Sequence, residues 1–478
     1  MFRHRPTYLL ITAIVLAGAG CATSPEPTER KPAVEPPSAW SAPTAEVTEP
    51  ARPNTKAAGW LDQFHDPRLN ALVAEALERN LDLQATAARL EAARASARIA
   101  GADQYPQLGA GLSGGRREII FDETGGEPTK ITSDSYGLSL DLSWEIDVWG
   151  RLRNRGSAAI ADYEAAMADL DGARLSLVGN TAKFWFRTTT ARQLLDLADE
   201  TVSSFQSTVD LVRSRFESGI STSLELRLAL ANAAGARALK QLRAQEYEQA
   251  VRALEVLVGK YPANEIESVD ELPELDRPVP AGLPSELLNR RPDIFAAERR
   301  LAASDQRVSE ARKNLLPSLR LTASGGTASE DLTNIADLDY SVWSVIGGIT
   351  QPLFQGGRLR ANLDRSKAEA ERVYLDYSRT VLTAFQEVEN TLSGEQYLRA
   401  RETALLEAAL QSMGAQRLAE DEYAAGLTEI ITVLESQRRA LSAKNDYLSI
   451  REQRLRNRID LHLALGGDFG PQTAVAAN

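Results

Sequence analysis

The sequence predicts a protein dominated by α-helices, with membrane β-strands, in which a strand-strand-long-helical-hairpin unit occurs twice. Two observations predict this fold class. Most of the chain is an internal duplication, and each copy contains a pair of strand patterns followed by a very long helical window. A repeat of this length means that one supersecondary unit is built twice. The two copies therefore have to be interpreted together.

The duplication is visible as residues that match at one constant offset. The first copy contains Asp82, Ala85, Leu90, Ala92, Pro106, Leu108 and Gly114, which match Asp293, Ala296, Leu301, Ala303, Pro317, Leu319 and Gly325. After the strands a slightly shorter offset matches Gly150-Arg151-Leu152-Arg153 with Gly357-Arg358-Leu359-Arg360, and Gly219 with Gly426. One small length change between two equivalent units accounts for both offsets.

The N-terminus has the features of an export signal. Arg3, His4 and Arg5 precede an apolar run over residues 8–19 that is too short for a stable membrane helix. Residues 1–20 are therefore a predicted signal peptide. The run ends at Gly20-Cys21 and resembles a bacterial lipobox, which predicts that Cys21 carries a lipid such as palmitate. The alternative is a chance cysteine at an ordinary cleavage site, because Gly18 stands where Leu, Val or Ile is usual.

Composition excludes several classes of function. Cys21 is the only cysteine, so internal disulfides and thiol catalysis are excluded, and His65 and His462 are too far apart in sequence to suggest a metal site. Asp and Glu outnumber Lys and Arg by 66 to 54, which argues against a nucleic-acid partner. We therefore predict no metal and no cofactor. The near absence of His and Cys also disfavours a lipid-anchored enzyme, and composition alone leaves only carboxylate chemistry open.

The repeats divide the chain into consecutive segments. Residues 21–56 are rich in Pro, Ala, Glu, Ser and Thr, which predicts a flexible lipid-anchored linker. The predicted segments that follow are a first repeat over 57–260, a connection over 261–284, a second repeat over 285–468 and a C-terminal tail over 469–478.

Each repeat contains a window without proline that is rich in strong helix formers. The predicted helical hairpins cover residues 151–258 and 358–466, and the first helix of each can run for roughly sixty residues, on the order of 90–100 Å. Leu427, Leu434, Leu441, Leu448 and Leu455 recur at heptad spacing. Gly219 and Gly426 interrupt the helical pattern at matching places, where we expect each long helix to end and the chain to turn back.

The strand patterns, at about residues 107–147 and 318–352, alternate between apolar and polar residues. Leu138, Leu140, Leu142, Trp144 and Ile146 alternate with Ser139, Asp141, Ser143, Glu145 and Asp147. Alternation of this kind is typical of the wall of a water-filled membrane barrel. Two strands per repeat give four per chain, too few to close a barrel, so we expect the barrel to be shared between chains. A trimer with twelve strands, above a barrel of helices, is the natural closure.

The most specific motif is Leu283-Pro284-Ser285-Glu286-Leu287-Leu288-Asn289-Arg290-Arg291-Pro292-Asp293-Ile294, followed by Ala297, Glu298, Leu301 and Pro317. Together with Trp60, Phe64, Asp66, Pro67 and Leu69, this motif resembles the outer-membrane efflux protein family, the TolC-like channels. The chain is most similar to the lipoprotein branch typified by OprM and NodT, and the resemblance covers nearly the whole mature chain.

The resemblance implies a homotrimeric exit duct in the bacterial outer membrane, with a long periplasmic extension and no chemistry of its own. Its partners would be a periplasmic adaptor (membrane fusion protein) and an inner-membrane pump, usually of the resistance-nodulation-division type. The cargo would be drugs or other small molecules. A type I protein-secretion channel is the alternative within transport, and a periplasmic adaptor is the alternative from another class, although an adaptor would have only one hairpin and no barrel strands.

The resemblance also implies site residues. A periplasmic gate would consist of an apolar ring at Ile431, an acidic ring at Glu435 and a latch at Tyr423. Three converging carboxylates would favour cations. The adaptor-docking tips would be Gly219, Ile220, Ser221, Gly426, Leu427 and Thr428. The gate is expected only in the second hairpin, because Leu224 and Leu228 stand at the matching positions of the first.

Overall fold

The computed structural model describes residues 31–33, 36–42, 59–121, 128–269, 271–275, 279, 282 and 284–467. The predicted signal peptide, Cys21 and the predicted C-terminal tail lie outside these residues. The chain forms two compact units. Unit 1 contains residues 89–167 and 296–377, and unit 2 contains residues 34–88, 168–295 and 378–478. Each unit combines parts of both sequence repeats.

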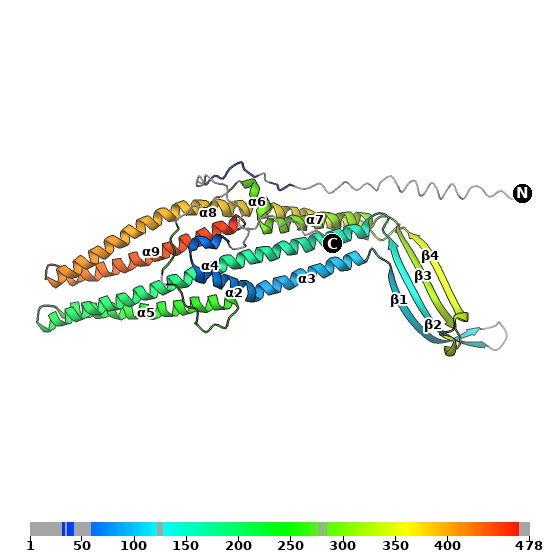
Figure 1. The fold of residues 1–478 in the computed structure, drawn as a ribbon, viewed down its shortest axis with the longest axis horizontal. Coiled ribbons are helices and arrows are strands. Elements are labelled where there is room, and N and C mark those ends of the chain that lie inside the picture. Colours follow the sequence, from blue (N-terminus) through cyan, green and yellow to red (C-terminus); the bar gives the residue numbers. More distant parts are fainter. Residues whose placement is uncertain are drawn as a thin grey trace. The chain divides into compact units, whose positions relative to one another are not determined.

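Unit 1 contains one antiparallel sheet with the strand order β1-β2-β3-β4 (Figure 1). The strands are β1 (Gln107–Phe121), β2 (Thr129–Ile146), β3 (Ser318–Ser329) and β4 (Ser341–Thr350), and the short helices η3 (Leu332–Asn334) and η4 (Leu338–Tyr340) connect the last two. The repeats meet where β2 pairs with β3, with Leu140 opposite Gly325. Each repeat therefore contributes two strands to the sheet, as predicted.

One face of this sheet is apolar across all its strands. Cross-strand partners point to the same face, and Leu142 of β2 lies opposite both Leu108 and Ala323. The same face carries Leu112, Leu138, Leu140, Trp144, Leu319, Leu321, Trp343, Val345 and Ile349. The other face carries Ser139, Asp141, Ser143, Arg320, Thr322 and Ser324. The predicted alternation therefore holds where all four strands pair, whereas the outer ends of β1 and β2 place Arg116 and Asp134 on the otherwise apolar face.

The duplication is repeated in the hydrogen bonds that join strands to helices in unit 1. Trp144 Nε1 donates to the carbonyl of Gln104 over 3.0 Å, and Gln351 Nε2 donates to the carbonyl of Leu315 over 3.0 Å. These residues match at the two offsets found in the sequence. The carbonyls follow α3 (Leu81–Ala102) and α7 (Pro292–Lys313). The same junction is therefore built twice, although its donor has changed from an indole to an amide.

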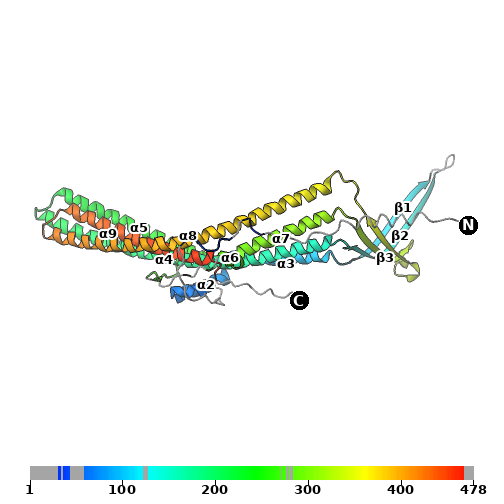
Figure 2. The same ribbon diagram turned by 90° about the horizontal axis from the view of Figure 1, so that it is seen from above.

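Unit 2 contains the ends of two long helical hairpins (Figures 1 and 2). The first pairs α4 (Arg151–Glu217) with α5 (Ser223–Val258), and the second pairs α8 (Arg358–Ala424) with α9 (Ile430–Ala464). Shorter helices are η2 (Gly59–Phe64), α2 (Pro67–Arg79) and α6 (Pro284–Arg290). Among the described residues, no helix combines the length and apolarity needed to cross a membrane.

The ends of α5 and α9 make a second pair of duplicated contacts. Asn80 Nδ2 donates to the carbonyl of Leu257 over 2.8 Å, and Arg291 Nη1 donates to the carbonyl of Ala464 over 3.1 Å. Gly259 and Gly466 have φ angles of 83° and 86°, and a Cβ atom at either would lie 2.7 Å from a main-chain oxygen. Both positions require glycine, because the conformation is left-handed and the neighbouring backbone is too close.

Part of the predicted flexible linker is instead attached to α8. Trp40 Nε1 donates to the carbonyl of Gly282 over 2.9 Å, and its ring packs edge-on against Phe385 at 6.1 Å. The Glu389 carboxylate accepts hydrogen bonds from the backbone N–H groups of Ser41 and Ala42, each at 2.8 Å. Composition predicted no contacts here, but one indole and one carboxylate are enough to dock this turn of chain.

His462 lies at one end of a series of packed aromatic rings in unit 2, which continues through Trp60 and Phe64 to Phe186. Its ring stacks on Trp60 with the centroids 5.0 Å apart, and its Nε2 atom lies 2.8 Å from Nε2 of Gln63. Phe64 packs edge-on against Phe186 nearby. Burial, together with the charge of Arg458, lowers the pKa of His462 to about 3. The imidazole is therefore neutral in the folded chain.

This burial predicts acid sensitivity. The pKa of His462 is depressed from 6.5, so its contribution to stability is complete above pH 6.5 and is lost as the pH falls from 6.5 towards 3. The loss should be about 1.4 kcal/mol per pH unit for a single group. We expect His462→Gln to flatten this part of the pH profile, measured as the melting temperature of the full chain in detergent between pH 7.5 and pH 4.5.

His65→Asn is the matched control. His65 is exposed, and asparagine tolerates its φ of 51°. The pH profile of this variant should follow that of the unsubstituted chain. A His462→Gln variant with an unchanged profile would contradict the assignment.

Candidate functional site

The two hairpin tips in unit 2 bring together the residues that the sequence singled out. Both turns have the same main-chain geometry. Ile220 N–H donates to the carbonyl of Arg215, and Leu427 N–H donates to the carbonyl of Glu422, each over 2.8 Å. Gly219 and Gly426 have φ angles of 74° and 78°. Both glycines therefore occupy the C′ position of a Schellman turn, as predicted.

The tips share one apolar core made by four helices. Its buried members are Phe205, Val209 and Val212 of α4, Ala229, Ala233 and Ala236 of α5, Ala419 and Tyr423 of α8, and Ile430, Val433 and Leu434 of α9. The small alanine side chains of α5 allow its backbone to approach the neighbouring helices closely. Because both hairpins contribute, moving one hairpin away from the other would expose this core.

Tyr423 connects the two hairpins within one chain. Its side chain is buried, its hydroxyl lies 3.4 Å from Ser221 Oγ of the first tip, and the Arg215 guanidinium lies 4.7 Å from its ring centroid. Arg215 also donates a hydrogen bond to the Tyr423 carbonyl. Tyr423, the predicted latch residue, therefore contacts the first hairpin through Ser221 and through an arginine of α4. Sequence reasoning missed Arg215, which is the counterpart of Glu422 in the duplication.

A buried polar cluster lies next to this core. Gln437 Nε2 donates to Thr208 Oγ1, Glu420 Oε1 and Ser204 Oγ at 2.9, 2.9 and 3.2 Å. Gln437 is 3% exposed, and within the described residues its Oε1 atom has no hydrogen-bond partner. An unpaired buried carbonyl oxygen costs on the order of 1–3 kcal/mol. The contact between α9 and α4 is therefore less stable here than an apolar contact of the same size.

Exposed apolar side chains mark both tips at equivalent positions. Ile220 and Leu224 of the first tip correspond to Leu427 and Ile431 of the second, and all four are more than half exposed. Isolated exposed leucines need no explanation, but a pair repeated at both tips indicates a contact surface. Ile431, the predicted apolar gate residue, therefore shares its environment with Leu224.

Glu435 lies on the exposed face of α9, between two arginines of its own helix. Its Oε1 atom is 2.8 Å from Arg439 Nε, and its other oxygen pairs with Arg438. Hydrogen bonds from Arg439 and then Arg438 lower the pKa of Glu435 below its usual value, which keeps the carboxylate ionised. The first hairpin has Leu228, Ala231 and Asn232 at the matching positions. This group of charges therefore belongs to the second hairpin alone.

The helices that leave the two tips begin differently. Thr222 caps α5, and its side chain forms a capping box with Glu225. The equivalent residue Glu429 precedes α9 and makes no side-chain cap hydrogen bond. A side-chain cap stabilises a helix by about 1 kcal/mol. The start of α9 is therefore less stable than the start of α5.

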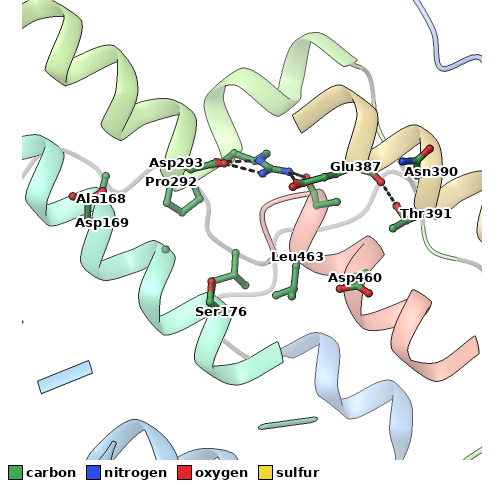
Figure 3. A pocket seen from close by; sticks show the side chains of 14 residues that line it. Ala168, Asp169, Ser176, Pro292, Asp293, Glu387, Asn390, Thr391, Asp460 and Leu463 are labelled. Atoms are coloured by element: carbon green, nitrogen blue, oxygen red, sulfur yellow. Dashed lines mark hydrogen bonds and ion pairs between the residues drawn. The ribbon is translucent and has the colours of Figure 1, made fainter. Parts of the chain in front are cut away.

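A second candidate site is a cavity of about 540 Å³ lined by α4, α7, α8 and α9 (Figure 3). Arg291 lines it and pairs with Asp293 at 2.8 Å and Glu387 at 2.7 Å. Asp460 on its wall pairs with Lys183 of α4. These charged groups are already paired, which makes this cavity a structural junction. Within the described residues no cluster of His, Cys, Asp or Glu is arranged to hold a metal ion.

Comparison with known proteins gives matches over nearly the whole chain. A family model described as outer membrane efflux protein matches residues 72–260 and 283–467. The chain is 32% identical over 470 residues to the pyoverdine export outer membrane protein OpmQ of Pseudomonas putida KT2440, covering 97% of this chain and 98% of that protein. It is 33% identical over 462 residues to the outer membrane protein OprJ of Pseudomonas aeruginosa PAO1, covering 96% of each.

A solved structure agrees with these matches. The crystal structure of the open state of the Neisseria gonorrhoeae MtrE outer membrane channel is similar to this chain with a TM-score of 0.80. The two chains are 31% identical, and the similarity covers 93% of this chain and 98% of MtrE.

The contact between Arg215 and Tyr423 predicts a local loss of stability on substitution. Arg215→Met keeps most of the side-chain length but removes the hydrogen bond to the Tyr423 carbonyl and the cation above its ring. We expect the second tip to lose about 1–2 kcal/mol. Amide hydrogen exchange of residues 420–433 should accelerate by roughly 5- to 30-fold, at the same global melting temperature.

Arg213→Met is the matched control, since Arg213 lies two residues away, is about half exposed and has only a 3.9 Å pair with Asp210. Exchange at the tip should be the same as in the unsubstituted chain. Equal exchange rates in the two variants would remove Arg215 from the latch.

Proposed function

The chain belongs to the outer membrane efflux protein family, and we propose that it is the exit channel of a tripartite efflux pump. The single observation that carries this function is the pairing of an amphipathic sheet with two long helical hairpins in every chain. The relatives OpmQ and OprJ are outer membrane proteins, and OpmQ exports pyoverdine. By analogy, this channel passes small molecules such as drugs or solvents from the periplasm to the exterior.

We propose that three copies share a barrel of twelve strands. β1 and β4 are edge strands of the sheet in a single chain, and an edge in lipid leaves N–H and C=O groups unpaired. Pairing β4 of one copy with β1 of the next satisfies both edges. The apolar face then contacts lipid, and the face with Asp141 and Arg320 lines water. Cys21 supplies a lipid anchor at the start of the linker.

We assign the periplasmic gate to the second hairpin, at Ile431 and Glu435, with Tyr423 as its latch. Glu435 alone would give an acidic ring that favours cations, as predicted from the resemblance. Its pairing with Arg438 and Arg439 makes the ring less acidic, because each copy also brings two guanidiniums to the same face of α9. The ring is then a set of ion pairs in which Glu435 offsets part of a positive field.

We assign adaptor docking to the two tips. Gly219, Ile220 and Ser221 of the first tip match Gly426, Leu427 and Thr428 of the second, and the turns have the same hydrogen bonds. Equal tips on each chain offer equivalent surfaces to a periplasmic adaptor. The inner-membrane partner would be a pump of the resistance-nodulation-division type. A type I secretion pump is the second candidate, and the similarity to OpmQ favours small-molecule export.

Reconstitution tests the channel. The purified full-length chain should have the mass of three copies in detergent and should conduct ions in planar bilayers. Glu435→Ala removes the carboxylate that offsets Arg438 and Arg439, so the ratio of cation to anion permeability should fall, measured as the reversal potential in a salt gradient.

Glu248→Ala is the control, because Glu248 also pairs with an arginine of its own helix, Arg252 at 2.8 Å, but lies in α5 far along the chain from the tip. Its permeability ratio should not change. A monomeric chain without conductance would contradict the channel, and an unchanged ratio in Glu435→Ala would remove Glu435 from the gate.

Crosslinking tests the docking tips. Ser221→Cys and Thr428→Cys should each form a disulfide with an adaptor that carries one cysteine at its own hairpin tip, in cells that express the complete pump. Ser207→Cys, on an exposed part of α4, should not. A pump that exports its substrates without any crosslink from either tip would count against this docking site.

A further inference from the structure

The first turns of α4 and α8 carry arginines next to the sheet, which runs against the preference of a helix start for acidic residues. In the first repeat these arginines are neutralised locally. Arg151 pairs with Glu145 at 2.8 Å, and Arg153 pairs with Asp147 at 3.5 Å. The arginines of the first repeat are therefore neutralised by carboxylates of the same repeat and need no ligand.

The second repeat lacks these carboxylates. Pro352 and Phe354 stand at the positions that match Glu145 and Asp147, whereas Arg358 and Arg360 are retained. Arg358 donates to the amide oxygen of Gln355 over 2.6 Å. Among the described residues neither Arg358 nor Arg360 lies within ion-pair distance of a carboxylate. The second repeat therefore keeps two arginines beside the sheet without a neighbouring carboxylate.

Further arginines line a cavity of about 400 Å³ in unit 1, between α3, α4, α7 and α8. Its polar lining consists mainly of Arg155, Arg307, Arg365, Asn314, Asn362 and Glu310. Three guanidiniums and two amides therefore face a space that contains a single carboxylate. The volume is ample for a phosphate group together with its ester substituents.

The guanidiniums keep free donors. Arg155 pairs with Asp103 at 2.9 Å and Arg307 pairs with Asp162, but both arginine side chains remain about half exposed. Arg365 donates to Asn362 Oδ1 over 2.9 Å and makes no ion pair within 4 Å among the described residues, although the Glu369 carboxylate interacts electrostatically with it and with Arg307. Each guanidinium has five N–H groups, so one or two internal bonds leave the others for a ligand.

The cavity lies close to the sheet along the chain. Its three arginines are within about two turns, roughly 6–11 Å, of the helix ends that lead into the strands. At the same junction Tyr105 and Phe354 are 71% and 89% exposed. Exposed aromatic side chains at the end of a membrane element are typical of the interface with lipid headgroups.

We propose that this cavity binds the phosphate of an anionic phospholipid headgroup in the periplasmic leaflet. The proposal rests on the proposed function, because it requires the sheet to lie in the membrane. Guanidiniums bind phosphate through two parallel hydrogen bonds, and asparagine amides add neutral donors. The positive ends of the α4 and α8 dipoles favour the same charge. The lipid phosphate would neutralise Arg365, whereas Arg358 and Arg360 do not line this cavity.

Lipid binding to the purified full-length chain tests the proposal. After delipidation in detergent, bound lipids are counted by native mass spectrometry with phosphatidylglycerol or phosphatidylcholine. The unsubstituted chain should prefer phosphatidylglycerol. An arginine near an anionic surface contributes on the order of fivefold to affinity, so Arg365→Gln should lower the preference by about that factor. The triple Gln variant at positions 155, 307 and 365 should abolish it.

Arg417→Gln is the matched control, since it removes one positive charge from the same helix at an exposed residue that does not line the cavity. Its preference should equal that of the unsubstituted chain. No preference in the unsubstituted chain, or equal losses in Arg365→Gln and Arg417→Gln, would overturn the site. If excess inorganic phosphate displaces the bound phosphatidylglycerol, the ligand is free phosphate and the lipid assignment is wrong.

Conductance in phosphatidylcholine bilayers is measured on the same preparations. A conducting channel without lipid preference would overturn the lipid site and leave the channel intact. Lipid preference without conductance would leave the lipid site and contradict the channel.

Discussion

Main-chain hydrogen bonding along β1 and β4 is the constraint on which the rest of the structure depends. The single chain supplies one sheet with two free edges, and each unpaired N–H or C=O group in hydrocarbon costs several kcal/mol. No side chain can compensate for a whole edge. In the proposed barrel, copies of the chain therefore pair through these edges, which gives an axis of symmetry.

The duplication preserves hydrogen bonds to the main chain, while the side chains that make them change. Asn80 and Arg291 make equivalent hydrogen bonds to the ends of α5 and α9, although one is an amide and the other a guanidinium. The larger residue also reaches Asp293 and Glu387, which makes the second junction an ion-paired one. A duplicated position therefore keeps its hydrogen bond to the backbone and is free to gain further contacts.

The sequence predicts the local structure well because local rules determine it. Alternation along β2 and the glycines at 219 and 426 depend only on neighbouring residues, and the strand pairs and both turns are found where these patterns place them. Contacts between segments far apart in the sequence do not follow from such local rules. Arg215 meets Tyr423 across two hairpins, and a heptad pattern indicates which side is buried without naming the partner. The Glu435 pairs could have been predicted, because arginines three and four residues later share its helix face.

The two tips differ in stability in a way that suits one fixed and one moving hairpin. A capping box holds the start of α5, whereas α9 begins without a side-chain cap and contacts α4 through a glutamine with an unpaired oxygen. Each difference amounts to about 1–2 kcal/mol, which is comparable to what the contact between Arg215 and Tyr423 can contribute. The free energy contributed by the contact between Arg215 and Tyr423 is therefore similar to the free energy lost through the missing cap or the unpaired oxygen. In the proposed pump, an adaptor that covers the exposed apolar pairs at both tips would need to supply only a few kcal/mol per chain to free the second hairpin, and burial of four aliphatic side chains is sufficient.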